Sequence, residues 1–576
     1  MNYKDTINLP KTRFPMRANL AQREPRMLER WQNEDWYAKI QRATADRPPF
    51  ILHDGPPYAN GDIHIGHAVN KLLKDMVIRS RLLDGYRVPY VPGWDCHGLP
   101  IELQVEKKVG KVGAKTDAET FRRKCREFAE KQIDRQRGDF QRLGVLGAWG
   151  DRYATMDFRY EADMLRALAR IVEQGHLHRG AKPVHWCFDC GSALAEAEIE
   201  YHDKTSPAID VLFEAADPSA LLAVFDTEPR AGETAGVAIW TTTPWTLPAN
   251  QAVALHPELE YVLVRGQWNG REVAVVLAAE LVADVSSRCG IQVQERSDAV
   301  PGSCLERIHL RHPFMDRDSL VVLGEHVTTE QGTGAVHTSP GHGQEDFEVG
   351  RRYGLETLNP VDAKGVFDEQ AGPFAGEFVW KANDSIVAAL RASGHLLNVE
   401  PFEHSYPHCW RHKTPTAFRV TSQWFIAMDR AGLRDAALQA IERVQWIPGW
   451  GKARIHGMIE NRPDWCISRQ RTWGVPLALF VDRDSGELHP ETVSLMRAAA
   501  DVVEQDGVDA WYRPDIAERV GVDPERYEPI TDILDVWFDS GVSHYCVLES
   551  RPELRRPADL YLEGSDQHRG WFQSSL

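Results

Sequence analysis

The sequence lacks the features that mark membrane-spanning and secreted proteins. No apolar run approaches the roughly 20 residues that a helix needs to cross a bilayer. The opening residues, Met1 to Asp5, lead into polar sequence without the apolar core of a signal peptide. Nine cysteines are scattered over 576 residues, which argues against a disulfide framework. We therefore expect a cytoplasmic protein that has no membrane partner.

The sequence also lacks an excess of basic residues. It has 67 Lys and Arg against 84 Asp and Glu, so its net charge is −17. This balance argues against a surface devoted to nucleic acid. Phosphate contacts need only a local basic surface, however, so the charge leaves an RNA partner undecided. No internal repeat is visible, and the length predicts roughly three to five domains.

The most informative stretch is P-P-Y-A-N-G-D-I-H-I-G-H at residues 56–67. The apolar run at 50–53 predicts a buried parallel strand before it. Apolar residues at helical spacing after it, including Val69, Leu73 and Met76, predict a helix that closes at 84–85. The stretch is thus expected to be the turn between a strand and a helix.

Such a turn is where open α/β sheets bind anions, because free N–H groups and the helix dipole point at the ligand. His64 and His67 are placed to donate hydrogen bonds to phosphate oxygens. Gly66 has no Cβ, so a flat base can approach its backbone. The alternative is a tight Pro/Gly turn that carries surface histidines.

This stretch resembles the HIGH signature of class I aminoacyl-tRNA synthetases, and its longer form is similar to that of the bacterial isoleucyl branch. The segments G-W-D-C-H-G-L-P-I-E at 93–102 and W-C-I-S-R-Q-R-T-W-G-V-P at 465–476 carry the same resemblance. It implies an α/β fold, a Rossmann-like doubly wound parallel sheet split by a large β-rich inserted editing domain. The expected divisions are an N-terminal helical arm at 1–48, the first half of the catalytic domain at 49–183, the insertion at 184–416 and the second catalytic half at 417–576.

Two carboxylates are expected at the carboxyl ends of strands, where ligands bind in such sheets. Asp95 suits the ammonium of an amino acid, and helix capping is its alternative role. Glu563 suits ribose hydroxyls. The resemblance implies that Glu563 contacts the aminoacyl-adenylate and that Gln567 joins Asp95 at the amino group. It also implies an aliphatic side-chain pocket walled by Pro56, Trp537 and Trp571.

Two short ligand motifs border the insertion. C-F-D-C supplies Cys187 and Cys190 at entry, and C-W-R-H supplies Cys409 and His412 at exit. Each spacing lets two ligands on one turn meet a tetrahedral Zn²⁺. A Zn²⁺ would clip the two connecting strands together, and the resemblance implies a metal near this place. The alternative is a pair of knuckles without metal, with free thiols.

Inside the insertion, T-T-T-P-W-T and G-T-G-A-V-H-T-S-P-G-H-G resemble the editing site of the isoleucyl, valyl and leucyl branches. By themselves, the threonines are typical of a solvated edge strand and the histidine of a buried core residue. The resemblance implies that the site positions a water and the tRNA's terminal adenosine, and that Asp346 anchors a substrate ammonium. The residues implied are Thr241, Thr242, Thr243, Thr246, His337 and Asp346.

Taken together, the resemblance implies ATP-dependent activation of L-isoleucine, its transfer to tRNA(Ile), and hydrolytic editing of mischarged valine. ATP would be used with Mg²⁺, and the protein is expected to be a monomer. The alternatives are a valyl or leucyl sister enzyme, a stand-alone deacylase and a non-catalytic nucleic-acid-binding protein. The family's second signature, K-M-S-K-S, and its anticodon-binding domain are absent from this sequence. We therefore expect a truncated portion that binds adenylate weakly and does not charge tRNA.

Overall fold

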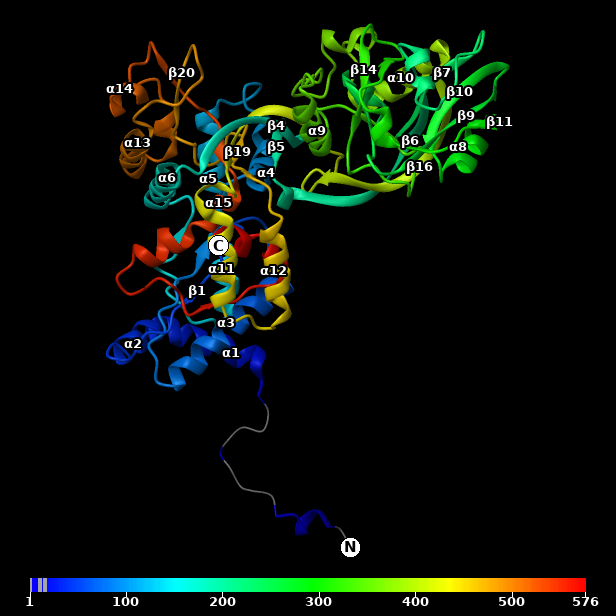
Figure 1. Cartoon of the computed structure of the whole chain (residues 1–576). Coiled ribbons are helices and arrows are strands. Elements are labelled where there is room, and N and C mark those ends of the chain that lie inside the picture. Colours follow the sequence, from blue (N-terminus) through cyan, green and yellow to red (C-terminus); the bar gives the residue numbers. More distant parts are fainter. Residues whose placement is uncertain (1–2, 9–12, 14–17) are drawn as a thin grey trace. The chain divides into compact units, whose positions relative to one another are not determined.

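The computed structural model describes residues 3–8, 13 and 18–576, and the chain divides into two compact units (Figure 1). Unit 1 contains Met1–Gly175, Asp429–Arg462 and Thr472–Leu576. Unit 2 contains His176–Met428 and Pro463–Arg471. The boundaries expected after residues 183 and 416 fall inside the first segment of unit 2, and unit 2 also includes a short second segment, Pro463–Arg471.

Parallel strands form the centre of unit 1. β23 (Leu560–Tyr561) pairs in parallel with β1 (Leu52–His53), and β2 (Gly93–Trp94) pairs in parallel with β3 (Tyr153–Ala154). Parallel bridges from Pro49 to Arg87 and from Tyr58 to Asp95 join these pairs into one succession. Parallel neighbours need long crossovers, and helices provide them here: α3 (Ile65–Leu83) after β1, then α4 (Leu99–Val109) and α5 (Ala118–Arg142) after β2.

The helix predicted after the H-I-G-H turn is present as α3, and its buried face carries charged side chains. Val69, Leu73 and Met76 are 49%, 45% and 62% exposed. Lys71 and Lys74, in contrast, are only 2% and 0% exposed. These lysines pair with buried carboxylates, so this apolar-periodic helix turns charged side chains inward.

Helices and short strands complete unit 1. The N-terminal arm is helical as expected, with α1 (Leu20–Asn33) and α2 (Trp36–Ala43). The remaining elements are α6 (Phe158–Glu173), α11 (Leu433–Arg443), α12 (Trp450–Glu460), β20 (Phe480–Asp482), α13 (Thr492–Asp506), α14 (Ile516–Val520), β21 (Tyr527–Pro529), β22 (Ile533–Leu534), α15 (Val536–Gly541) and α16 (Trp571–Ser575).

Unit 2 is rich in strands, as the Val, Thr and Ile runs predicted. Its largest sheet has the order β11-β9-β10-β7-β6-β16, and β12 adds to β9. The strands are β6 (Ile199–Glu214), β7 (Thr234–Thr241), β9 (Glu260–Trp268), β10 (Arg271–Ala278), β11 (Gln292–Arg296), β12 (Val300–Pro301) and β16 (Leu396–Cys409). Figure 1 shows β6 and β16 as the long antiparallel ribbon along which the chain enters and leaves this sheet.

Two smaller sheets and four helices surround it. One sheet has the order β13-β14-β8-β15 and the other β18-β17-β4-β5. Their strands are β4 (Leu177–Cys187), β5 (Ser192–Leu194), β8 (Ala252–Leu255), β13 (His309–Arg311), β14 (Asp318–Leu323), β15 (Ala335–Thr338), β17 (Ala417–Ile426) and β18 (Trp465–Cys466). The helices are α7 (Pro218–Ala223), α8 (Val282–Cys289), α9 (Gln344–Tyr353) and α10 (Val379–Ser393).

The prediction of an α/β fold with parallel strands, interrupted by a β-rich insertion, is confirmed. Apolar strands and α10 build one large core in unit 2, whereas the core of unit 1 gathers around β1, β2 and α5. Within the described part of the chain, every helix is too short or too polar to cross a bilayer.

Candidate functional site

The two histidines of the H-I-G-H turn bond to their own helix end. His64 is the N-cap of α3: its Nδ1 accepts from the Gly66 N–H at 3.1 Å, and its own N–H donates to His67 Nδ1 at 3.3 Å. An Nδ1 that accepts is unprotonated, so each neutral ring carries its proton on Nε2. Both rings can therefore offer an Nε2–H donor to an anion.

The charge state of His67 and the space beside Gly66 both agree with rings that donate through Nε2–H. Burial, the neighbouring His64 and Lys71 lower the pKa of His67 to about 4, so it is neutral at pH 7. A Cβ on Gly66 would lie 2.9 Å from the His64 ring. Gly66 thus makes room for that ring, a reason for glycine that the sequence did not reveal.

Asp95 lies directly after β2 and is 6% exposed. Its Oδ1 accepts from the Thr155 hydroxyl at 3.3 Å. Burial and the nearby Asp539 raise its pKa well above the usual range, whereas His97 opposes the rise. A buried carboxylate with this pKa gains most from a cationic ligand, because an ammonium stabilises the ionised form.

His97, two residues after Asp95, lies between two acidic side chains. Its Nδ1 lies 2.6 Å from Asp539 Oδ2, and its Nε2 lies 3.3 Å from Glu161 Oε1. Although burial alone would lower the pKa of His97, these two carboxylates raise it to about 9. The imidazolium ion is therefore the stable form at neutral pH.

Glu563 follows β23, and both of its carboxylate oxygens accept hydrogen bonds. Its Oε1 accepts from Lys74 Nζ at 2.5 Å and from the Gly55 N–H at 3.2 Å. Its Oε2 accepts from Asn70 Nδ2 at 2.8 Å. Lys74 and Asn70 were missed by sequence reasoning, although two lysines and an asparagine inside an apolar-periodic helix were a signal that a polar group faces inward.

The remaining residues expected around the amino acid lie near the end of the chain. Gln567 Oε1 accepts from the Trp571 N–H at 3.1 Å, and its Nε2 donates to Asp566 at 2.9 Å. Trp571 is 2% exposed and stacks on Tyr561 with ring centroids 4.5 Å apart. Trp537 is half-buried at the start of α15, and Pro56 is half-buried in the turn after β1.

The strand topology explains how these distant residues come together. His64, Asp95 and Glu563 follow β1, β2 and β23, which run parallel in the succession described above. Residues that follow parallel strands lie at the same edge of a sheet, where open α/β folds bind their ligands. The edge therefore presents donors for an anion, a carboxylate for a cation and an oxygen acceptor.

In unit 2, the threonine-rich segment and the glycine-rich segment are joined by hydrogen bonds. Thr246 Oγ1 lies 2.8 Å from His337 Nε2, and Thr243 Oγ1 lies 3.4 Å from Thr246 Oγ1. Thr241 Oγ1 continues the chain at 3.2 Å from Thr243 Oγ1, and Thr242 is half-buried beside it. Burial lowers the pKa of His337 to about 4, so this ring too is neutral.

Asp346 is the carboxyl group predicted for this site. It lies in the first turn of α9, and its Oδ2 accepts from the Ser339 N–H at 2.9 Å. Burial raises its pKa to about 7. Ser339 also donates through its hydroxyl to the Thr246 carbonyl at 3.4 Å, so one residue links the carboxylate to the threonines.

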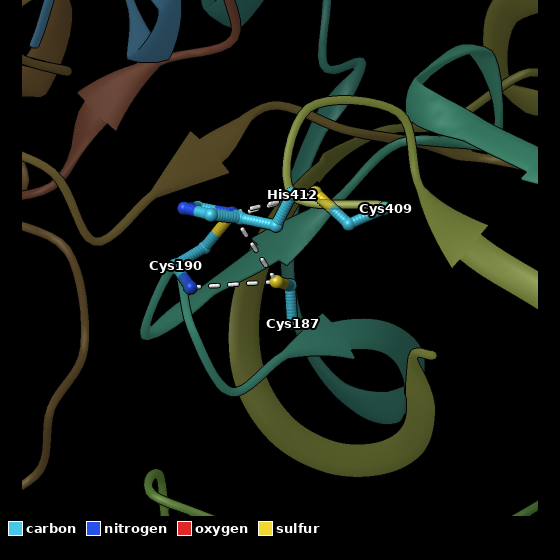
Figure 2. Close-up of side chains that lie close together, drawn as sticks. All are labelled: Cys187, Cys190, Cys409 and His412. Atoms are coloured by element: carbon cyan, nitrogen blue, oxygen red, sulfur yellow. Dashed lines mark hydrogen bonds between the residues drawn. The ribbon is translucent and has the colours of Figure 1, made fainter. Parts of the chain in front are cut away.

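The four predicted metal ligands converge in unit 2, with donor atoms all within 4.8 Å of one another (Figure 2). The Cys190 and Cys409 sulfurs are 3.7 Å apart, and His412 Nδ1 is 3.2 Å from Cys190 and 3.8 Å from Cys187. Tetrahedral Zn²⁺ with Zn–S bonds of about 2.3 Å places its sulfur ligands about 3.8 Å apart. The donor set and its spacing fit Zn²⁺.

A family model and the curated relatives of this chain agree on its family. Residues 26–576 match the model described as tRNA synthetases class I (I, L, M and V). The chain is 60% identical over 575 residues to an isoleucine--tRNA ligase of Alcanivorax borkumensis, and the match covers 100% of this chain and 61% of that protein. It is 61% identical over 577 residues to an isoleucine--tRNA ligase of Alkalilimnicola ehrlichii, with the same coverage.

Among solved structures, the chain aligns with LeuRS of Agrobacterium radiobacter K84, crystallised with tRNA and LeuAMS, at 16% identity and a TM-score of 0.42. That alignment covers 97% of this chain and 64% of LeuRS. The chain spans 61% of the length of the curated relatives that it matches.

Proposed function

The chain belongs to the class I tRNA synthetases (I, L, M and V), and from this premise we propose that it is the activating and editing part of an isoleucine--tRNA ligase. The observation that carries the proposal is the shared edge of parallel strands in unit 1, where His64, Asp95 and Glu563 present donors, a cation site and an acceptor. The identity of about 60% to isoleucine--tRNA ligases over the whole chain favours isoleucine as the substrate.

In the proposed first step, the carboxylate of isoleucine attacks the α-phosphorus of ATP, and pyrophosphate leaves. The Nε2–H groups of His64 and His67, at the N-terminus of α3, stabilise the negative charge on the phosphates. Asp95 holds the substrate ammonium, with Gln567 beside it, and Glu563 accepts from the ribose. Pro56, Trp537 and Trp571 wall the aliphatic side chain. These groups act by positioning and by charge.

Mg²⁺ would accompany ATP. Mg²⁺ is usually bound by substrate phosphates and keeps several of its water ligands, so it would reach the site on the triphosphate oxygens of ATP. Zn²⁺ would be held by Cys187, Cys190, Cys409 and His412, where it would link β4 to the end of β16 without taking part in the reaction.

In the proposed second step, a terminal hydroxyl of tRNA(Ile) takes the isoleucyl group and AMP leaves. Misactivated valine lacks one methylene and is rejected weakly by a hydrophobic pocket, a limit for which isoleucyl enzymes are themselves the standard example. Unit 2 would therefore hydrolyse valyl-tRNA. Asp346 holds the substrate ammonium, His337 contacts the terminal adenosine, and the threonine hydroxyls orient a water. We propose that the protein acts as a cytoplasmic monomer.

Isoleucine-dependent exchange of pyrophosphate into ATP tests the first step. We expect exchange from a polypeptide that continues this chain to the length of its relatives, and none above background from the 576 residues alone, which lack K-M-S-K-S. Preference for valine or leucine in the longer polypeptide would favour a sister enzyme. Robust exchange by these residues alone would contradict the expected dependence on the second signature.

Deacylation of valyl-tRNA by the same 576 residues tests the editing role separately. Activity that survives replacement of His64 and His67 but is lost in Asp346→Asn would place hydrolysis in unit 2. If unit 2 hydrolysed valyl-tRNA while unit 1 bound neither ATP nor an adenylate analogue, the chain would be a deacylase alone. A protein with neither activity that still bound tRNA would be the non-catalytic binder.

A further inference from the structure

A cluster of four charged side chains is buried beside the proposed adenylate site. Asp54 and Glu563 supply two negative charges, and Lys71 and Lys74 supply two positive charges. Lys74 is 0% exposed, and its Nζ lies 2.6 Å from Asp54 Oδ1 and 2.5 Å from Glu563 Oε1. Lys71 bonds to the other oxygen of Asp54. The two positive and two negative charges of this cluster balance. Removal of either lysine would therefore leave a buried carboxylate without full charge compensation.

Lys74 connects two strands that are far apart in sequence. Asp54 follows β1, and Glu563 follows β23, its parallel neighbour. Lys74 projects from α3, the crossover helix that starts at the H-I-G-H turn. The same ammonium thus ties the ends of both strands to the helix that carries the histidines.

The hydrogen bonds of Glu563 leave it a limited capacity for a ligand. An ionised carboxylate has about four acceptor positions. Oε1 already accepts from Lys74 and from the Gly55 N–H, and Oε2 accepts from Asn70. Among the contacts of the described residues, one position on Oε2 is therefore left. A Cβ on Gly55 would lie 2.5 Å from Oε1, so the carboxylate fills the space beside that glycine.

We propose that Lys74, with Asn70, is the positioning group of Glu563: it fixes the carboxylate so that Oε2 meets a single ribose hydroxyl of the adenylate. This inference rests on the proposed function. It assigns Lys74 an indirect role, because Lys74 has 0% of its side chain exposed and acts through Glu563.

The electrostatics agree with this role. Burial raises the pKa of Glu563, and Lys74 opposes that rise more than any other neighbour. Burial would lower the pKa of Lys74, but Asp54 and Glu563 outweigh it and raise that pKa above the usual value. Without Lys74, the carboxyl of Glu563 would shift toward its protonated form, which accepts hydrogen bonds less well.

A double-mutant cycle on the 576-residue chain tests the proposal. Four proteins are compared: wild type, Lys74→Met, Glu563→Gln and the double variant. Binding of a sulfamoyl analogue of isoleucyl-adenylate is measured by calorimetry. A hydrogen bond to a charged group predicts that each single variant binds about 10- to 100-fold more weakly. If Lys74 acts through Glu563, the double variant binds no more than about threefold more weakly than the weaker single variant.

A second readout separates positioning from a general loss of structure. Analogues that lack the 2′ or the 3′ hydroxyl of the ribose are titrated against the same proteins. We expect removal of one of these hydroxyls to weaken binding to wild type by about tenfold, and to leave binding to Lys74→Met unchanged. The proposal would be overturned if the affinity loss in the double variant equalled the product of the two single-variant losses. It would also be overturned if Lys74→Met still bound the analogue more weakly when the ribose hydroxyl was removed.

Lys74→Met leaves two buried carboxylates with less compensation and can fail to fold. Asn70→Ala then decides, because it removes the donor to Oε2 without removing a charge. It should weaken binding of the analogue and reduce the hydroxyl dependence, and unchanged values would refute the proposal. Arg81→Met is the matched control on α3, since Arg81 forms an exposed 3.5 Å pair with Asp84. If wild type did not bind the analogue measurably, the same titration on the longer polypeptide would decide, and absence of binding there would mean that the proposed function itself fails.

Discussion

The candidate sites of unit 1 and unit 2 differ in how many of their polar groups carry a charge. Around β1 and β23, Lys71 and Lys74 face Asp54 and Glu563, and Asp95 lies close to a protonated His97. In unit 2, the contacts between the threonines and His337 are neutral, and Asp346 is the one carboxylate among the predicted residues.

The difference matches the two proposed reactions. Forming an adenylate develops charge on a phosphate, so fixed charges in a site that excludes water are useful there. Hydrolysis of an ester needs a water in the correct place, and neutral hydroxyls can orient that water without binding it too tightly. The comparison predicts that the two sites respond differently to mutation, to pH and to metal removal.

The largest expected effect is the separation of the two sites. Asp346→Asn should reduce deacylation of valyl-tRNA by about 100-fold or more, the size seen when a key electrostatic group is lost from an active site. Binding of the adenylate analogue should change less than twofold. His64→Ala combined with His67→Ala should show the reverse pattern in the longer polypeptide, where pyrophosphate exchange is measured. A single variant that abolished both activities would contradict the separation of the two sites.

The pH dependence should also differ. Asp346 has a pKa of about 7, so its ionised form, which holds the ammonium, is lost as the pH falls below about 7. Deacylation should then fall by up to about tenfold per pH unit on the acid side. Binding of the analogue in unit 1 should not follow this acid limb, because Asp346 takes no part in it. Asp346→Asn should lack the acid limb, and an acid limb that persisted there would contradict the assignment.

The same carboxyl predicts a slope in stability. Asp346 binds its proton more tightly in the folded than in the unfolded state, because its pKa is raised from 3.8 to about 7. The free energy of unfolding should therefore decrease as the pH rises from about 4 to about 7. Urea unfolding at several pH values measures the slope, and Asp346→Asn should flatten it, whereas Asp318→Asn, at an exposed position of unit 2, should not.

Removal of metal should affect unit 2 alone. If Cys187, Cys190, Cys409 and His412 hold Zn²⁺, a chelator should release about one ion per chain and lower the melting temperature of unit 2 by several degrees. Cys190→Ser should do the same, and Cys304→Ser, at an exposed cysteine, should have no effect. Elemental analysis of the purified chain gives the stoichiometry, and absence of bound metal at pH 7 would favour free thiols.

The smallest expected effect concerns the neutral hydrogen bonds. Thr243→Val should weaken deacylation only about 3- to 10-fold, since one neutral hydrogen bond contributes about 1 kcal/mol. Thr246→Val should cost more, because it also leaves His337 Nε2 buried without its 2.8 Å partner. Equal losses at both positions, measured by the rate of valyl-tRNA hydrolysis, would show that the contact with His337 is unimportant.

Local sequence patterns predicted some elements of the fold, whereas the resemblance to class I synthetases supplied the doubly wound sheet and most of the candidate residues. Period-2 and period-3.6 patterns and turn residues act over a few positions, so the strand, turn and helix around His64 and the β-rich insertion could be predicted. The spacing of the cysteines likewise indicated ligands that meet across 219 residues, and the structure brings their donor atoms within 4.8 Å.

The buried side of α3, and the groups that hold the predicted residues, depended on contacts that form only when the chain is folded. Val69 and Met76 are apolar but exposed, whereas Lys74 is charged but fully buried. The reason is that hydrophobic periodicity assumes an apolar core. A core that contains Asp54 and Glu563 instead selects cations, and no local pattern on α3 encodes the two carboxylates that strand pairing brings there from opposite ends of the chain.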